Sequence, residues 1–207
     1  MYKRGSENMD TVNHISTIEY YNNNAEPFTF GTINADMSET RERFLKYLPD
    51  HSLILDFGCG SGRDTKAFLD KGYRVEAIDG SEALCKFASR YTGISVKCML
   101  FQELDEYEKY DAIWACASIL HLSETELKDV MIKMSNSLKY GGIIYTSFKY
   151  SDFEGERNGR YFIDFTEDKF DKFLSGLNAL KIIDQWITSD VRPDRDDEKW
   201  LNLILKK

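Results

Sequence analysis

A glycine-rich turn near residue 60 constrains this chain more than any other stretch. The apolar run 53–55 ends in Asp56, and Gly58, Gly60 and Gly62 follow at every second position. An amphipathic pattern begins directly afterwards, so the segment predicts a strand, a tight turn and the start of a helix. A turn of this kind brings bare backbone against a nucleotide-like ligand. A glycine loop that merely reverses the chain is the alternative.

An acidic residue closes the next predicted strand. Asp79 follows the apolar run 73–78, about 20 residues past the first glycine, where a carboxylate can bind both hydroxyls of a ribose. The pattern is not the dinucleotide one, because Gly62 comes one position early. Asp64 also falls in the first helical turn, where a second carboxylate would repel a bound diphosphate. A cofactor with a sulfonium and an ammonium group tolerates these acids, and Asp56 could lie near its positive end.

These residues resemble motif I of the class I S-adenosylmethionine-dependent methyltransferases. The resemblance continues through residues 77–81, 110–118 and 138–145, and it covers most of the chain from about Phe44 to Lys207. Within that superfamily the chain looks most like the small bacterial methyltransferases of the tellurite-resistance-like group, on residues 62–64, 147–149 and 190–193. The resemblance implies S-adenosylmethionine as cofactor and S-adenosylhomocysteine as product.

In open α/β sheets the ligand lies beyond the carboxyl ends of the strands. Together with the resemblance, this rule predicts the cofactor-binding residues Asp56, Gly58, Cys59, Gly60, Gly62, Arg63, Asp79, Gly80, Ser81, Phe101, Gln102, Ala115 and Tyr21. The resemblance gives the adenine amino edge to the main chain around Phe101 and Gln102, although neither is the acid that the family often has there. It also suggests that Tyr20 and Tyr21 belong to a lid. Ordinary aromatic packing is the alternative for both.

His121 is the predicted catalytic base. It lies just past the fourth predicted strand, and an unperturbed imidazole with a pKa near 6.5 suits proton transfer at neutral pH. A histidine that caps or packs at the start of the next helix is the alternative. No covalent intermediate is required for methyl transfer, so Ser118 and Cys116 are expected in the wall of the site.

A basic and aromatic loop after the fifth predicted strand is the expected substrate gate. The predicted substrate-binding residues are Ser118, Lys149, Tyr150, Arg157, Arg160 and Arg192, the last on the resemblance alone. Such a cluster on an acidic chain could receive an anionic small substrate. A solvated loop with routine charges is the alternative.

Two sequence patterns that the chain lacks limit the class of methyl acceptor. The Pro-Pro-aromatic loop of methyltransferases that act on DNA bases is replaced by Ala-Cys-Ala-Ser at 115–118, and the metal triad of catechol-type enzymes has no counterpart. We therefore expect a metal-independent transfer to a small molecule. A non-catalytic cofactor- or partner-binding module is the alternative function, and a nicotinamide-dependent oxidoreductase is a more remote one.

Strand and helix patterns alternate with short connections. They predict helices at 38–48, from the glycine-rich turn to about 71, at 81–90, 124–138 and 167–174, and strands at 53–57, 73–78, 94–99, 111–115, 143–148, 180–187 and 199–205. The predicted class is α/β: a single Rossmann-like doubly wound, mostly parallel seven-stranded sheet with an antiparallel C-terminal edge hairpin. We expect one domain over 1–207, with 1–13 mobile and 14–48 forming an N-terminal helical lid segment.

Composition limits the partners. The net charge of −8 lacks the global attraction that sequence-independent nucleic-acid binding needs, so no nucleic acid is expected. No apolar run is long enough to span a membrane, and no signal sequence is evident. Four cysteines without a C-x-x-C pair predict reduced, mostly buried thiols, no metal site and a cytoplasmic protein. A monomer or a homodimer is expected.

Overall fold

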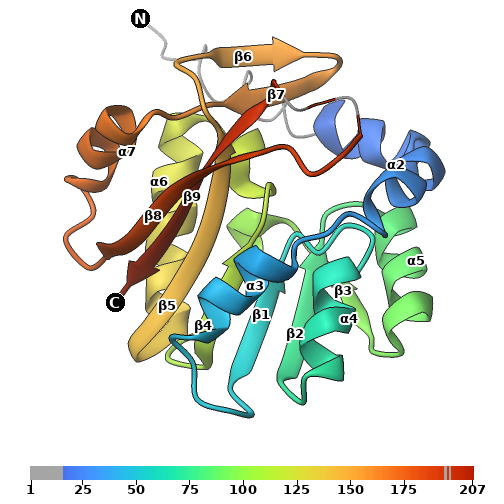
Figure 1. The fold of residues 1–207 in the computed structure, drawn as a ribbon, viewed down its shortest axis with the longest axis horizontal. Helices are drawn as coiled ribbons and strands as arrows, with labels where there is room; N and C mark the ends of the chain where they lie inside the picture. Colours follow the sequence, from blue (N-terminus) through green and yellow to red (C-terminus); the bar gives the residue numbers. More distant parts are fainter. Residues whose placement is uncertain (1–15, 194, 196) are drawn as a thin grey trace, which may run out of the picture.

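A seven-stranded sheet forms the centre of the computed structural model, which describes residues 16–193, 195 and 197–207 (Figure 1). The strand order is β3-β2-β1-β4-β5-β9-β8. The strands are β1 Leu53–Phe57, β2 Arg74–Asp79, β3 Val96–Cys98, β4 Tyr110–Ala115, β5 Leu138–Lys149, β8 Lys181–Ser189 and β9 Lys199–Lys206. The first five run parallel, and β9 is antiparallel to both β5 and β8. The predicted fold class, including the antiparallel ending, is confirmed.

Helices cover both faces of this sheet. They are α2 Ala25–Thr32, α3 Ser38–Leu45, α4 Arg63–Asp70, α5 Glu82–Thr92, α6 Glu124–Ser137 and α7 Glu167–Leu174, with short 3-10 turns η1 Phe101–Glu103 and η2 Ile119–His121. Residues 16–23 are also helical. On one face Phe44 of α3 and Phe68 of α4 pack against Trp114 of β4, and on the other α6 and α7 pack against the alternate residues of the same strands.

Strand β1 shows why the sequence pattern works. Ile54 belongs to the core on the α3–α4 face, and Leu55 belongs to the core on the α6 face. Both are fully buried. A strand covered on both faces needs apolar residues at consecutive positions, which is why short apolar runs predicted these strands. The parallel strands end together at the upper edge in Figure 1, where the glycine-rich turn lies.

The N-terminal segment has two parts. Phe44 of α3 is fully buried against Phe68 and Trp114 in the layer beside the sheet. Helix α3 begins at Ser38, whose N–H donates a hydrogen bond to the Asp36 carboxylate. Residues 16–23 and α2 lie near the carboxyl ends of the strands (Figure 1). A lid formed by residues 14–48 stays a prediction. The mobile segment expected at 1–13 lies outside the described residues.

Three local predictions are corrected. The strand predicted at 143–148 is longer, because β5 begins at Leu138, runs through Gly141 and Gly142, and shifts register against β4. The loop after β5 contains a two-stranded hairpin, β6 Glu154–Arg157 and β7 Arg160–Ile163, above the sheet (Figure 1). Of the four thiols, only Cys85 is buried and Cys98 is exposed. No helix of the described residues is long and apolar enough to cross a membrane.

Candidate active site

The glycine-rich turn and the tip of β2 are joined by one carboxylate. Asp79 accepts hydrogen bonds from the Gly60 N–H at 2.8 Å and from the Ser81 N–H at 2.9 Å. Burial raises the pKa of the Asp79 carboxyl, and these two N–H groups oppose the shift. Each oxygen therefore keeps a lone pair for a ligand while the carboxylate is held rigidly. The glycine-rich turn and the end of β2, which the sequence predicted to form one site, are therefore in contact.

Two of the glycines are required by close packing. A Cβ at Gly58 would lie 2.5 Å from the Ser118 Cβ, and one at Gly62 would lie 2.8 Å from the Thr92 Cγ2. Both residues also have a positive φ, of 88° and 79°, which side chains with a Cβ rarely adopt. Gly58 therefore lets the turn approach the end of β4. Gly62 lets α4 pack against α5 and does not line the cavity.

The two acids near the turn have different environments. Asp64 binds Arg41 and Arg63, each at 2.7 Å, and accepts a hydrogen bond from the Trp114 indole N–H at 3.0 Å. Burial alone would raise the pKa of Asp64, but the two arginines outweigh it and hold that pKa below its usual value. Its charge is thus compensated within the protein, which corrects the expectation that Asp64 would repel a bound anion.

Asp56, unlike Asp64, has no ion pair with a lysine or arginine among the described residues. It is buried, and its carboxylate accepts a hydrogen bond from the Thr65 hydroxyl at 2.5 Å. Burial, reinforced by the negative charge of Asp64, raises the pKa of Asp56 to about 7. A cation bound nearby would stabilise the ionised form, so this corner of the cavity favours a positively charged ligand group.

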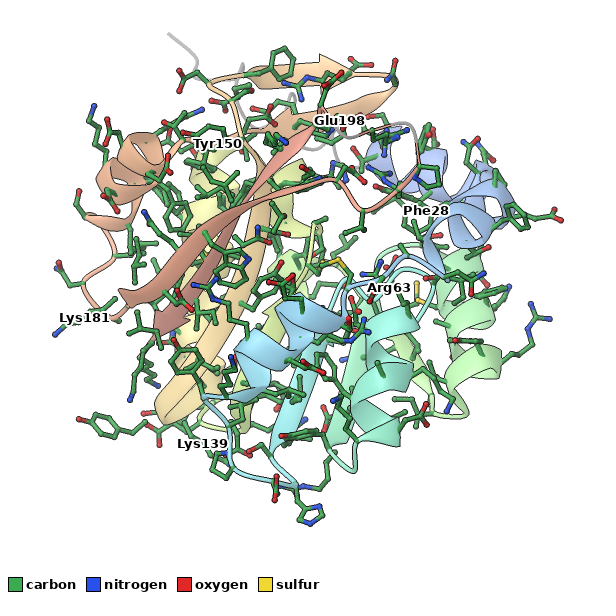
Figure 2. All side chains as sticks on the ribbon, viewed as in Figure 1. Phe28, Arg63, Lys139, Tyr150, Lys181 and Glu198 are labelled. Atoms are coloured by element: carbon green, nitrogen blue, oxygen red, sulfur yellow. The ribbon has the colours of Figure 1, made fainter. Side chains whose placement is uncertain are left out.

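These residues open onto a cavity of about 960 Å³. Residues from the N-terminal helical segments form its cover: a Cβ at Gly60 would lie 3.1 Å from the Phe28 ring, and one at Gly80 would lie 3.5 Å from Ile18. In Figure 2 Phe28 lies between α2 and the start of α4, close to Arg63. The β6–β7 hairpin contributes Arg160 and Phe162 to the wall.

A tyrosine–histidine pair forms part of this wall. The Tyr21 hydroxyl lies 2.9 Å from the His121 Nε2, and the His121 Nδ1 lies 2.7 Å from the Tyr161 carbonyl oxygen. Because a carbonyl only accepts, the ring proton is on Nδ1, and Nε2 accepts from Tyr21. Arg160 Nη1 also donates to the Tyr21 oxygen at 3.2 Å. The pair is therefore aligned for proton transfer from Tyr21 to His121.

The titration of His121 differs from the sequence expectation. Burial lowers its pKa to about 4, Arg160 adds to the shift, and the Tyr161 carbonyl opposes it. Burial likewise raises the pKa of the Tyr21 phenol, which Arg160 opposes. Both groups are neutral near pH 7, so His121 does not titrate with its unperturbed pKa. Its basic nitrogen faces the tyrosine hydroxyl rather than the open cavity.

Most predicted site residues line this one cavity. The structure places there Asp56, Gly58, Cys59, Gly60, Arg63, Asp79, Gly80, Ser81, Phe101, Gln102, Tyr21, His121, Ser118, Lys149, Arg157, Arg160 and Arg192. Gly62, Ala115 and Tyr150 are outside it. Ala115 is fully buried in β4, and the Tyr150 hydroxyl donates to Glu167 at the start of α7.

Sequence reasoning missed one wall of the cavity. Trp186 and Thr188 of β8 and Asn202 of β9 line it, together with Tyr145, whose hydroxyl donates to the side-chain Oδ1 of Asn202 at 2.7 Å. No local motif marks these residues, because strand pairing alone brings them to the cavity. The β6–β7 hairpin did have a signal: Asn158-Gly159 is a preferred two-residue hairpin turn, and both residues have a positive φ.

Comparison with known proteins identifies the chemistry of this arrangement. A 1,6-didemethyltoxoflavin-N1-methyltransferase from Burkholderia thailandensis, solved with its bound substrate and S-adenosylhomocysteine, matches 100% of this chain and 92% of its own with a TM-score of 0.77 and 20% identity. A family model described as a methyltransferase domain matches residues 54–142. The chain therefore carries a methyltransferase domain at residues 54–142. S-adenosylhomocysteine, the demethylated form of S-adenosylmethionine, is the cofactor bound in the Burkholderia neighbour.

Relatives of this methyltransferase differ in their acceptors. Human N-terminal Xaa-Pro-Lys N-methyltransferase 1 is 32% identical over 130 residues, which cover 56% of this chain and 58% of the human protein. TehB from Haemophilus influenzae matches 87% of this chain and 65% of its own with a TM-score of 0.68 and 16% identity. That likeness is one of fold, so the closer grouping with tellurite-resistance-like methyltransferases stays a prediction.

The residues present fit this cofactor. The cavity volume is within the range of small-molecule sites. Gly58, Cys59 and Gly60 all line this cavity, so the backbone of the glycine-rich turn faces the space that a cofactor would occupy. An oriented carboxylate at Asp79 and an acid at Asp56 suit a ribose and a cationic tail. When bound, S-adenosylmethionine supplies an activated methyl group.

Proposed function

We propose that this enzyme transfers a methyl group to an oxygen or nitrogen atom of a small-molecule acceptor, and that Tyr21 and His121 take up the acceptor's proton. The observation that carries the proposal is the hydrogen bond between the Tyr21 hydroxyl and the His121 Nε2 in the cavity wall. Methyl transfer is an in-line displacement, so the protein's tasks are to position the acceptor, exclude water and accept a proton.

The proposed cofactor contacts use the rest of the cavity. Asp79 binds the ribose hydroxyls, the main chain around Phe101 and Gln102 binds the adenine edge, and Asp56 lies at the positive end of the cofactor. Tyr21 lines the same cavity as Asp79 and His121. A tyrosine at that position can touch the acceptor atom.

The proton moves in two linked steps. The acceptor O–H or N–H gives its proton to the Tyr21 oxygen while the Tyr21 proton passes to the His121 Nε2. The resulting imidazolium donates from Nδ1 to the Tyr161 carbonyl, and Tyr21 ends neutral. Because the pKa of His121 is about 4 in the free protein, the imidazolium returns its proton to solvent readily after transfer.

The volume of the cavity supports a small acceptor. About 960 Å³ is within the range of small-molecule sites. Phe28 lies beside Gly60 and Ile18 beside Gly80, and Lys149, Trp200 and Asn202 line the side toward β9. The protein-directed activity in the name of the human relative remains an alternative that the experiment below includes.

The test is a screen for S-adenosylhomocysteine release with S-adenosylmethionine, a library of small alcohols, amines and phenols, and N-terminal peptides. We expect turnover with at least one small molecule. Tyr21→Phe should lower kcat roughly 100-fold or more, while affinity for S-adenosylmethionine is retained. Tyr20→Phe removes the neighbouring hydroxyl and is the matched control, expected to keep its activity.

Three results would contradict the proposal. Turnover with peptides alone would reject the acceptor class. Weaker S-adenosylmethionine binding by Tyr21→Phe, with kcat unchanged, would make Tyr21 part of the lid over the cofactor rather than a proton acceptor. Equal losses in the Tyr20 and Tyr21 variants would show that aromatic packing of the helix, not the hydrogen bond to His121, is responsible.

A further inference from the structure

Six of the seven lysines and arginines that line the cavity already have a carboxylate partner. Among the described residues these ion pairs are Arg43–Asp184, Arg63–Asp64, Lys149–Glu198, Arg157–Asp164, Arg192–Asp190 and Arg195–Glu198. Arg160 forms no ion pair with any residue of the described ranges. The basic cluster expected from the sequence is therefore neutralised except at one position.

Aromatic rings surround the Arg160 guanidinium and reduce its screening by water. Its guanidinium carbon lies 4.4 Å from the centre of the Tyr20 ring and 5.1 Å from that of Phe162. Aromatic faces stabilise a cation without neutralising it, and they displace water that would screen it. An anion arriving at this guanidinium therefore meets a stronger field than at an exposed arginine.

Arg160 also has unused hydrogen-bond donors. Its Nη1 donates to the Tyr21 hydroxyl at 3.2 Å, and its buried Nε has no partner in the part of the chain that the structure describes. A guanidinium carries five N–H donors in a planar fork that fits a carboxylate or phosphate in a bidentate way. The side chain is thus an incomplete oxyanion site at the cavity wall.

We propose that the methyl acceptor carries a carboxylate or phosphate group, and that Arg160 binds it. This inference rests on the proposed function and adds the chemical class of the substrate. Arg160 touches Tyr21, which touches His121, so the bound oxyanion lies within a few ångströms of the position where the acceptor's proton is removed. A small acidic metabolite, with its oxyanion near its nucleophilic atom, fits this geometry.

The charge of the whole chain makes the site selective. A protein of net charge −8 repels anions in general. Lysines and arginines that are already in ion pairs attract an anion only weakly. Arg160, which has no carboxylate partner among residues 16–193, 195 and 197–207, is therefore the cation that can orient an anionic acceptor. The cofactor's own carboxylate is the competing anion, and the experiment separates the two.

The test is a calorimetric titration of the full chain, saturated with S-adenosylhomocysteine. The titrants are benzoate, inorganic phosphate and the neutral analogue benzamide. We expect an oxyanion to bind, and benzamide to bind more weakly than benzoate. Arg160→Gln should weaken oxyanion binding about tenfold or more, since a charge-assisted hydrogen bond is lost. Arg160→Lys should restore part of the affinity. Arg90→Gln makes the same charge change on the exposed surface of α5 and should have no effect.

Several outcomes would overturn this inference. Oxyanion affinities that are equal in the wild type and Arg160→Gln, or no oxyanion binding by the wild type, would remove Arg160 as a receptor. A loss of S-adenosylhomocysteine affinity in Arg160→Gln, with oxyanion binding kept, would assign Arg160 to the cofactor carboxylate. None of these three results affects the proposed function, which fails separately if no small molecule is methylated.

Discussion

Replacing Asp79 with asparagine tests the contact that organises the cofactor site. The Asp79 carboxylate holds the Gly60 and Ser81 N–H groups at 2.8 and 2.9 Å and keeps further lone pairs facing the cavity. Asparagine has nearly the same shape but loses the charge and one acceptor. The change therefore removes the carboxylate's charge from the ribose site while keeping the size and shape of the side chain.

The expected magnitude follows from hydrogen-bond energies. Two ribose hydroxyls that donate to a carboxylate contribute about 1.5–3 kcal/mol each, against about 0.5–1.5 kcal/mol for a neutral acceptor. Asp79→Asn should therefore weaken cofactor binding by about 2–3 kcal/mol, or roughly 30- to 160-fold. The free protein should also lose about 1–3 kcal/mol of stability, because the Gly60 and Ser81 N–H groups use different oxygens of Asp79 and the asparagine NH2 leaves one of them unpaired.

The assay is isothermal calorimetry with S-adenosylmethionine and with S-adenosylhomocysteine. Both contain the ribose, so both affinities should fall by the same factor. Asp105→Asn, which removes a charge from an exposed residue, is the matched control and should bind both normally. Unchanged affinity in Asp79→Asn, or a loss confined to the cationic cofactor, would refute a ribose contact and indicate a general charge effect instead.

Urea unfolding tests two other features of the site. Gly93→Ala should cost about 1 kcal/mol for its positive φ alone, and Gly62→Ala more, because a Cβ there meets Thr92 at 2.8 Å whereas none lies within 4 Å at Gly93; equal losses would contradict this. Burial lowers the pKa of His121 from 6.5 to about 4 and raises that of Asp56 from 3.8 to about 7, so their effects on stability oppose each other between pH 4 and 6.5. In Asp56→Asn only His121 remains, so the free energy of unfolding should fall by about 3 kcal/mol on acidification across that window. In His121→Gln only Asp56 remains, so the free energy of unfolding should fall by about 4 kcal/mol as the pH rises from 3.8 to 7. A flat profile in either variant would show that its remaining group is not buried as described.

The fold could be predicted wherever the signal is local. Strand Leu53–Phe57 and helix Glu167–Leu174 have the predicted limits, because an apolar run and an amphipathic period are properties of neighbouring residues. Asp79 was found for the same reason, since it ends a strand at a fixed distance from the turn. The edges of β5 were predicted less well, because a bulge lets the strand continue through Gly141 and Gly142.

The functional details depend on contacts between distant residues. Tyr21 and His121 are 100 positions apart, so their hydrogen bond and the lowered pKa of His121 could not be derived from either segment alone. The same holds for the cations. Arg157 and Arg160 look equivalent in the sequence, but Asp164 neutralises only the first. Burial and pairing, which only tertiary structure sets, decide which of these groups can act on a ligand.

A crystal structure of the complex with S-adenosylhomocysteine tests the central claim most directly. The account predicts ribose oxygens at about 2.5–3.0 Å from the Asp79 carboxylate, and the cofactor sulfur directed toward the Tyr21 hydroxyl. The space beside Arg160 should stay open for the acceptor. A cofactor bound away from Asp79, or one whose sulfur faces away from Tyr21 and His121, would contradict the account.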